Sequence, residues 1–133
     1  MWQYYNPNPY GKTVDDCTVR ALSIIEDVDW FGAYFMLCIE GARLGDMPNA
    51  NSVMRVLLRK KGYTRHIVPD TCPDCYTVYD FARDHREGTF PVCTGSHVIA
   101  VRDGVYYDPS DSGYEIVLYF YKKENDYGSI RTV

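Results

Sequence analysis

The sequence predicts an α+β protein in which N-terminal helices pack on a C-terminal antiparallel β-sheet. In the first half of the chain, apolar residues recur at helical spacing behind residues that commonly cap helices. From Thr89 onward the apolar residues alternate with a period of two, which is typical of strands with one buried face. The pair Asp103-Gly104 separates two such runs and is the strongest hairpin signal in the chain. Runs of helices followed by runs of strands indicate the α+β class.

Length and composition indicate one domain that spans residues 1–133. A chain of 133 residues with 46% hydrophobic residues can bury one core and is too short for two ordinary domains. The net charge of −4, with scattered Lys and Arg, argues against nucleic acid or a membrane surface as a partner. No apolar run approaches the roughly 20 residues that span a bilayer, and the N-terminal residues do not resemble a signal peptide. We therefore expect a cytoplasmic protein.

The N-terminal segment is expected to form an ordered loop that leads into a helix. Two Asn-Pro pairs impose extended or turn geometry before Lys12. Asp15 or Asp16 can then cap a helix that continues to about Glu26. The core side of this helix is expected to consist of Ala21, Leu22 and Ile25.

Two further helices are predicted before the first clear strand. Asp29 can cap a helix over residues 30–44, and Asn51 or Ser52 starts another that Gly62 ends. We expect the second of these to use Val53, Val56 and Leu57 on its core side. The residues that the helix over 30–44 is expected to bury are Tyr34, Phe35, Leu37 and Cys38.

The remaining elements are one short helix and several strands. Thr77 can cap the helix, with Asp80 in its first turn, and the helix should end by Gly88. The residues around it favour strands because they are rich in β-branched and aromatic side chains. The expected strands cover residues 63–68, 89–94, 96–102, 105–108 and 115–122.

The hairpin register predicts a contact between His97 and Asp108. If residues 103–104 form a two-residue turn, these two side chains are diagonal neighbours on one face of the hairpin. A carboxylate in that position can orient an imidazole. A three-residue turn would put Asp108 on the other face, and Asp111 would then be the alternative acid. The same face is expected to meet the helix of Cys17 and to carry Ile99, Val101, Tyr106 and Ser110.

Cys17 is the candidate nucleophile because it stands where a helix should begin. Unpaired backbone N–H groups and the positive end of the helix dipole favour a thiolate there. The neighbouring Asp15 and Asp16 would raise the thiol pKa unless they point away as caps. The alternative is that Cys17 is a packed small hydrophobic residue, and that His97 is an ordinary sheet-edge histidine.

The five cysteines are an odd number and are expected to be free, metal-bound or catalytic rather than a disulfide framework. Cys72 and Cys75 form a C-x-x-C pair that could supply zinc thiolates, a redox couple or a structural turn. A zinc site would need further ligands, for which His85, Cys93 and His66 are candidates, but none has a standard spacing. We therefore expect a structural turn and no metal or cofactor.

The order of Cys17, His97 and Asp108 resembles papain-like cysteine peptidases, especially the double-glycine leader peptidases. The shared elements are Asp-Cys at a helix start, then His with the apolar run VIAV, then Asp-Pro at 108–109. The resemblance implies a papain-like fold with these three residues as a catalytic triad. Such enzymes usually place a Gln upstream of the nucleophile as an oxyanion donor, and here Asn8 or Gln3 would have to replace it.

The sequence also resembles a group of small bacteriophage proteins over nearly its whole length. The segments that carry this resemblance are NPYGKTVDDCTVRAL, GDMPNANSV, PDTCPDCYTVYDFARDH and GTFPVCTGSHVIAVRDGVYYDPSDSG. The likeness implies a phage or prophage origin and a papain-like fold, and it does not supply a substrate.

Together these features predict a thiol hydrolase that acts on a protein or peptide, such as a host protein, without a cofactor. Cys17 would attack, His97 would act as base and then acid, and Asp108 would fix the histidine tautomer. One alternative is a catalytically weak or inactive binding protein of phage origin that blocks a host protein or sequesters a small ligand. A second alternative is a small zinc-stabilised interaction domain centred on the C-x-x-C pair.

Overall fold

The structure is a computed structural model that describes residues 1–124. Within these residues the chain forms four helices and one six-stranded sheet, so the predicted α+β class is confirmed. The elements are β1 (Trp2–Tyr4), α1 (Cys17–Ile25), α2 (Trp30–Leu44), α3 (Asn51–Lys60), β2 (Tyr63–Ile67), α4 (Val78–Asp84), β3 (Thr89–Cys93), β4 (Val98–Arg102), β5 (Val105–Asp108) and β6 (Tyr119–Lys123).

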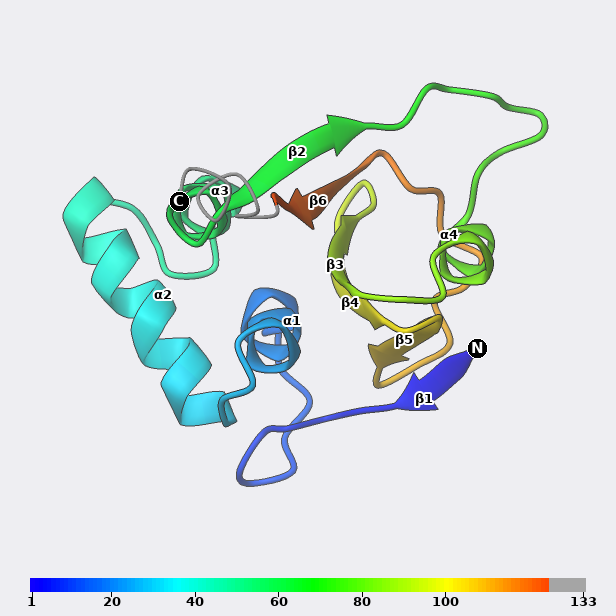
Figure 1. Cartoon of the computed structure of the whole chain (residues 1–133). Coiled ribbons are helices and arrows are strands. Elements are labelled where there is room, and N and C mark those ends of the chain that lie inside the picture. The colour runs from blue at the N-terminus through cyan, green and yellow to red at the C-terminus, as the bar shows by residue number, and fades with distance from the viewer. Residues whose placement is uncertain (125–133) are drawn as a thin grey trace, which may run out of the picture.

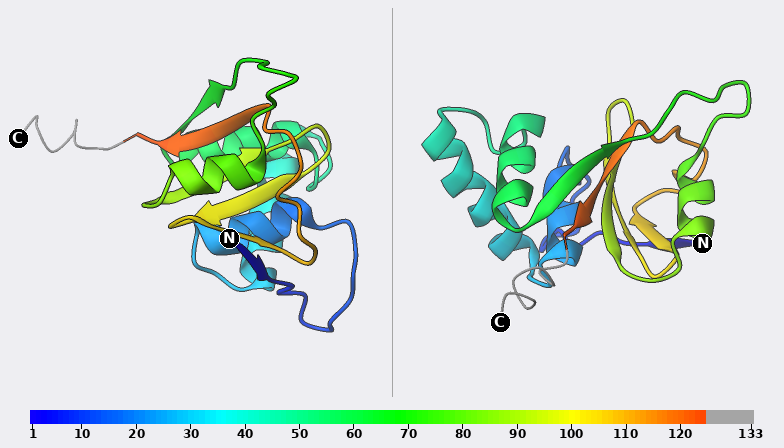
Figure 2. Two further views of the ribbon diagram at one scale, coloured as in Figure 1. Left: turned by 90° about the vertical axis from the view of Figure 1, so that its right-hand side faces the viewer. Right: turned by 45° about the horizontal axis from the view of Figure 1, so that its top comes forward.

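The sheet separates two groups of helices. Its strands lie in the order β1-β5-β4-β3-β6-β2, and all neighbours are antiparallel except β1 and β5. The helices α1, α2 and α3 lie on one side and α4 lies on the other (Figure 1). The left panel of Figure 2 shows α4 in front of the strands and the N-terminal helices behind them.

Strand β1 corrects the sequence-based prediction of a purely antiparallel sheet. The sequence predicts a loop up to Lys12, but Trp2–Tyr4 pairs in parallel with β5. All three residues of β1 are exposed, so no alternation of buried and exposed residues marks this strand. The backbone N–H of Tyr5 and the indole N–H of Trp2 both donate to the carbonyl of Asp108. The sheet is therefore mixed, and its parallel edge lies beside the predicted acid of the site.

Two hydrophobic clusters hold the layers together. One joins α1, α2 and α3 to one face of the sheet, and the other joins α4 to the opposite face. Strand β4 contributes to both, because its side chains alternate across the sheet. Val98 and Ala100 belong to the cluster of α1, whereas Ile99 and Val101 pack with Phe81 of α4.

Helix α2 is less buried than the sequence predicts. Leu37 is fully buried, but Tyr34 and Phe35 are 38% and 58% exposed, and Cys38 is half-buried. The prediction is wrong for these aromatic residues because apolar side chains surround α2, and a surface helix buries only one face. Glu40 lies on the buried face instead, and lysine and arginine side chains neutralise its carboxylate there.

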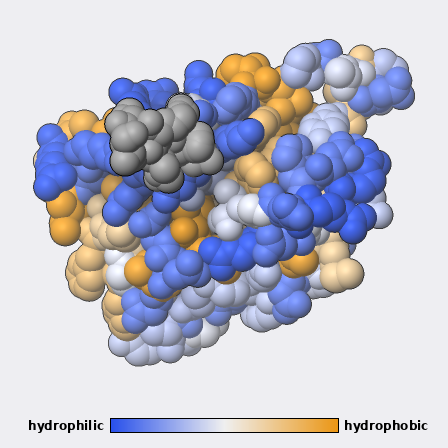
Figure 3. All heavy atoms as spheres, viewed as in Figure 1, coloured by the Kyte–Doolittle hydropathy of each residue, from blue (hydrophilic) through white to orange (hydrophobic). Residues whose placement is uncertain are grey.

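The surface of the described residues is mixed in character. Hydrophilic residues predominate on the face shown in Figure 3, and apolar residues form separate patches there. Among residues 1–124 no helix combines the length and the apolar character that crossing a bilayer requires.

Candidate active site

Cys17 is the first residue of α1, as the sequence predicts. Its side chain is half-buried against the cluster that α1 shares with the sheet. Asp16 occupies the N-cap position, but its carboxylate makes no hydrogen bond to the helix N–H groups. It accepts hydrogen bonds from Arg20 and from the indole N–H of Trp30 instead. The predicted capping role of Asp16 is therefore wrong, because a charged donor and a second N–H donor hold its carboxylate away from the helix end.

The sequence predicts a thiolate at Cys17, but the structure raises the pKa of this thiol. Burial of the side chain raises the pKa of the thiol, and the charge of Asp15 adds to that effect. The backbone N–H groups of Val98 and Thr18 and the charge of Arg20 act in the opposite direction without overcoming burial. The effect of desolvation on the thiol pKa is therefore larger than the opposite effect of the helix start. Burial thus favours the neutral thiol of Cys17 over the thiolate.

The β4–β5 hairpin brings His97 and Asp108 together. The strands pair across a two-residue turn at 103–104, which confirms the predicted register. Nε2 of His97 is hydrogen-bonded to Oδ1 of Asp108 at 3.3 Å and lies 3.2 Å from Oδ2. The alternative acid, Asp111, accepts a hydrogen bond from the Tyr106 hydroxyl instead. The structure therefore joins the two residues that the hairpin register predicted.

The face of the hairpin corrects a further expectation. The sequence predicts that His97 and Asp108 share a face with Ile99 and Tyr106, and that this face meets the helix of Cys17. Ile99 and Tyr106 do share a face, but it packs against α4. Helix α1 packs on the other face, to which Val98 belongs, and the backbone N–H of Val98 acts on the Cys17 thiol. His97 comes directly before β4, at the end of that strand.

Arg20 is a site residue that the sequence-based prediction missed. Its guanidinium is buried and binds both Asp16 and Asp108, with Nη2 at 3.3 Å from Oδ1 of Asp108. The arginine therefore links the start of α1 to the acid of the hairpin. The spacing of Asp16 and Arg20 by four residues on a helix indicates an ion pair, but only the fold shows that Asp108 shares the same cation.

The charges around His97 shift the pKa values of the pair in opposite directions. The hydrogen bond that His97 makes to Asp108 raises the pKa of His97, and burial opposes it without cancelling it. Burial raises the pKa of Asp108, but the hydrogen bond from His97, the nearby Ser112 hydroxyl and the charges of His97 and Arg20 outweigh burial and hold that pKa below its usual value. Each partner therefore stabilises the charged form of the other.

Asp108→Asn is expected to lower the pKa of His97, because it removes the largest cause of the upward shift. The folded-state pKa of His97 lies above its unfolded value of about 6.5, so its contribution to stability is present below that value and is lost as pH rises through the folded pKa. An NMR titration of the His97 ring proton in the native and variant proteins measures the change. An unchanged pKa would contradict the assigned pairing.

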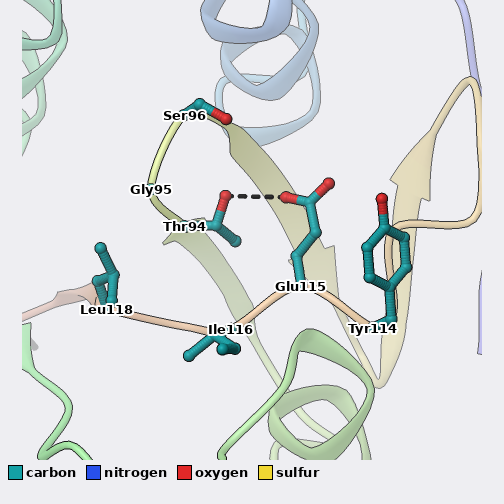
Figure 4. A pocket seen from close by; sticks show the side chains of 7 residues that line it. All are labelled: Thr94, Gly95, Ser96, Tyr114, Glu115, Ile116 and Leu118. Atoms are coloured by element: carbon teal, nitrogen blue, oxygen red, sulfur yellow. Dashed lines mark hydrogen bonds between the residues drawn. The ribbon is translucent and has the colours of Figure 1, made fainter.

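Glu115 is a second residue beside His97 that the sequence analysis placed only in a strand. Its Oε2 lies 4.0 Å from Nδ1 of His97, the ring nitrogen that does not face Asp108. Oε1 accepts a hydrogen bond of 2.8 Å from the hydroxyl of Thr94, as Figure 4 shows. The carboxylate lies in the wall of an open cavity of about 540 Å³, whose other lining residues are Thr94, Gly95, Ser96, Tyr114, Ile116 and Leu118.

Neither candidate oxyanion donor contacts the thiol: the donor nitrogen of Gln3 is engaged elsewhere, and Asn8 is held in a turn through its acceptor oxygen. Nε2 of Gln3 donates to the carbonyl of the adjacent Tyr4. Oδ1 of Asn8 accepts from the backbone N–H groups of Tyr10 and Lys12, which stabilises a turn in the N-terminal segment. The structure gives neither side chain a hydrogen bond with Cys17 among residues 1–124. An oxyanion at the thiol would therefore depend on backbone N–H groups at the start of α1.

Cys72 and Cys75 form a disulfide, which corrects the expectation that the cysteines are free, metal-bound or catalytic. The pair lies in the loop between β2 and α4, where Thr71 accompanies it in a hydrogen-bonded turn. Within residues 1–124 no group of three or more His, Cys, Asp or Glu side chains is arranged to hold a metal ion. The structural turn predicted for this segment is present, with a covalent bond across it.

The site thus combines a thiol at a helix start, a carboxylate-bound imidazole, and a buried arginine that connects the two elements. Such a set of groups is suited to nucleophilic chemistry. The papain-like fold and the phage family stay predictions, since comparison with protein-family models, curated proteins and solved structures found no match to this chain.

Proposed function

We propose that this protein is a thiol hydrolase that cleaves a peptide, isopeptide or other amide through Cys17. The contact of His97 with Asp108 carries the proposal, because it leaves Nδ1 of an oriented imidazole available as a base. Cys17 begins a helix that is packed beside Val98, the next residue after His97. The resemblances to papain-like peptidases and to small phage proteins support the same activity, a host cytoplasm as its location and a protein or peptide as its substrate.

In the proposed reaction Cys17 enters as a neutral thiol. The sulfur attacks the carbonyl carbon of the amide while His97 takes the thiol proton. The tetrahedral intermediate collapses, the C–N bond breaks, and the imidazolium gives its proton to the leaving amine. Water, activated by the neutral imidazole, then hydrolyses the thioester to release the acid and restore the thiol. Asp108 and Arg20 hold the imidazole in one orientation throughout.

Alkylation of Cys17 is expected to accelerate as pH rises through the raised pKa of His97. His97 must be neutral to accept the thiol proton, whereas a preformed thiolate–imidazolium pair would keep Cys17 reactive at about pH 6. Limiting iodoacetamide followed by peptide mass spectrometry measures the rate at each cysteine. His97→Ala should slow Cys17 by about tenfold or more, since general-base assistance typically contributes at least that much.

Cys93 is the internal control, because burial raises its pKa to about 12 and should make it inert. Cys38→Ser provides a matched variant that removes a half-buried thiol outside the site and should leave the rate at Cys17 unchanged. The hydrolase proposal fails if Cys17 reacts no faster than Cys93, or if His97→Ala does not alter its rate.

The alternative function is binding without catalysis, by a protein of phage origin that blocks a host protein or sequesters a small ligand. The raised pKa of Cys17 and the engaged side-chain nitrogen of Gln3 favour it. Turnover of a library of fluorogenic peptide amides separates the two functions. Hydrolysis that Cys17→Ser abolishes supports the enzyme, and its absence in a protein whose Cys17 is unreactive supports the binding protein.

A further inference from the structure

A second cavity, of about 380 Å³, lies between α3 and β2 and is lined by three arginines. Arg55 and Arg59 lie one turn apart on α3, and Arg65 lies on β2. The other lining residues are Tyr63, Thr64 and Tyr121. None of these residues belongs to the site around Cys17, so this cavity is a separate feature of the molecule.

The positive charge of this cavity is not balanced by carboxylates within residues 1–124. The adjacent Lys60 and Lys61 form ion pairs with Glu40 of α2 and with Glu26, respectively, whereas no described carboxylate lies within 4.0 Å of the three arginines. Glu124 binds the hydroxyl of Thr64 at 2.6 Å rather than an arginine. Like charges four residues apart on a helix, such as Arg55 and Arg59, disfavour the helix. The described part of the chain therefore presents a concentration of cations without carboxylate partners.

Tyrosine rings line this cavity or contact its cationic side chains. Tyr63 and Tyr121 are buried, so they can shape the cavity without large motion. The guanidinium of Arg65 lies over the ring of Tyr119, at 4.9 Å from its centroid. Nζ of Lys123 lies 5.8 Å from the centroid of Tyr63 and adds a fourth cation near the same place. Cation–π contacts of this kind limit the freedom of the long side chains before any ligand arrives.

We propose that this cavity binds the phosphate groups of a small phosphorylated ligand, such as a nucleoside diphosphate. Guanidinium groups match phosphate oxygens in bidentate geometry, and several of them together can hold a diphosphate. The volume lies within the range of small-molecule sites. The whole chain has a net charge of −4, so the arginine cluster is not a consequence of a generally basic sequence. An anion that enters the cavity removes the repulsion among the arginines.

Isothermal titration calorimetry of the full chain with pyrophosphate, ADP and adenosine tests the proposal. Pyrophosphate and ADP should bind and adenosine should not. Tighter binding of ADP than of pyrophosphate would identify a nucleotide ligand, and equal binding would identify a ligand recognised by its phosphates alone. Affinity should fall as ionic strength rises, because the cavity is open to solvent.

Variants with one arginine removed identify the site. Arg55→Gln and Arg65→Gln should each lower the affinity for pyrophosphate by about tenfold or more, as expected when one charged hydrogen-bonding partner is removed. Arg55→Gln should unfold at the same temperature as the native protein or higher, because its repulsion with Arg59 is relieved. Arg65→Gln gives up the contact with Tyr119 and should remain folded with only a small decrease in that temperature. Arg86→Gln removes an exposed arginine next to α4 and should leave binding unchanged. The proposal is overturned if no anion binds at millimolar concentration, or if all three variants bind as the native protein does.

Discussion

Arg20→Ala is expected to lower the free energy of unfolding by about 3–5 kcal/mol, the range measured when one partner of a buried ion pair is removed. The side chains of Asp16 and Asp108 are 6% and 2% exposed, and both depend on this guanidinium. Their negative charges would remain buried after the substitution, with only neutral donors and His97 to offset them. Guanidinium chloride denaturation at neutral pH measures the loss. Both proteins are fitted with the same m-value, the slope of the free energy of unfolding against denaturant concentration.

Arg43→Ala is the matched control for this substitution. Arg43 pairs with a buried glutamate at 3.6 Å, but its own side chain is 63% exposed. Exposed ion pairs contribute about 0–1 kcal/mol, so this variant should remain close to the native protein. Adding Asp108→Asn to Arg20→Ala should recover part of the loss, because one of the two stranded charges is removed. Equal effects of the two alanine variants would contradict the central role of Arg20.

Phe81→Ala is expected to cost about 3–5 kcal/mol, the range for truncating a buried aromatic residue. Phe81 of α4 is fully buried and lies among the rings of His85, Phe90 and Phe120, with centroid separations of 3.8, 5.5 and 4.9 Å. The cavity left by its removal would lie between α4 and the face of β4 that carries Ile99. Thermal and chemical denaturation of the variant give the size of the loss.

Phe35→Ala provides the comparison for Phe81→Ala because it deletes the same side chain from an exposed position. Phe35 is 58% exposed on α2. Substitutions at such surface sites usually change stability by about 0.5 kcal/mol or less. A similar loss in both phenylalanine variants would mean that α4 does not depend on Phe81 for its docking.

The parts of the fold that sequence predicts well are those that local chemistry determines. Asp29 accepts from the N–H of Gly32 at 2.8 Å, as a helix cap should. Thr77 and Asp80 form a reciprocal capping box at the start of α4. The turn at 103–104 has positive φ at both residues and fixes the hairpin register, which in turn brings His97 to Asp108. In each case the decisive residues are near neighbours in the chain.

The parts that sequence misses depend on contacts between distant segments. Three exposed residues of β1 find a partner strand only after the rest of the sheet has formed. Asp16 has the right residue type and position for a cap, but Trp30 and Arg20 take its carboxylate. The thiol pKa of Cys17 depends on how deeply α1 packs against the sheet, and spacing in the sequence does not give this depth.

The parallel pairing of β1 with β5 also determines when this site can form during synthesis. The hydrogen bond from the indole of Trp2 to the carbonyl of Asp108 joins residues 106 positions apart. A ribosome releases Cys17 well before His97 and Asp108. Pairings across so long a stretch of chain form late and slowly. We therefore expect a nascent chain that ends before β5 to leave β1 without a partner strand and His97 without its carboxylate.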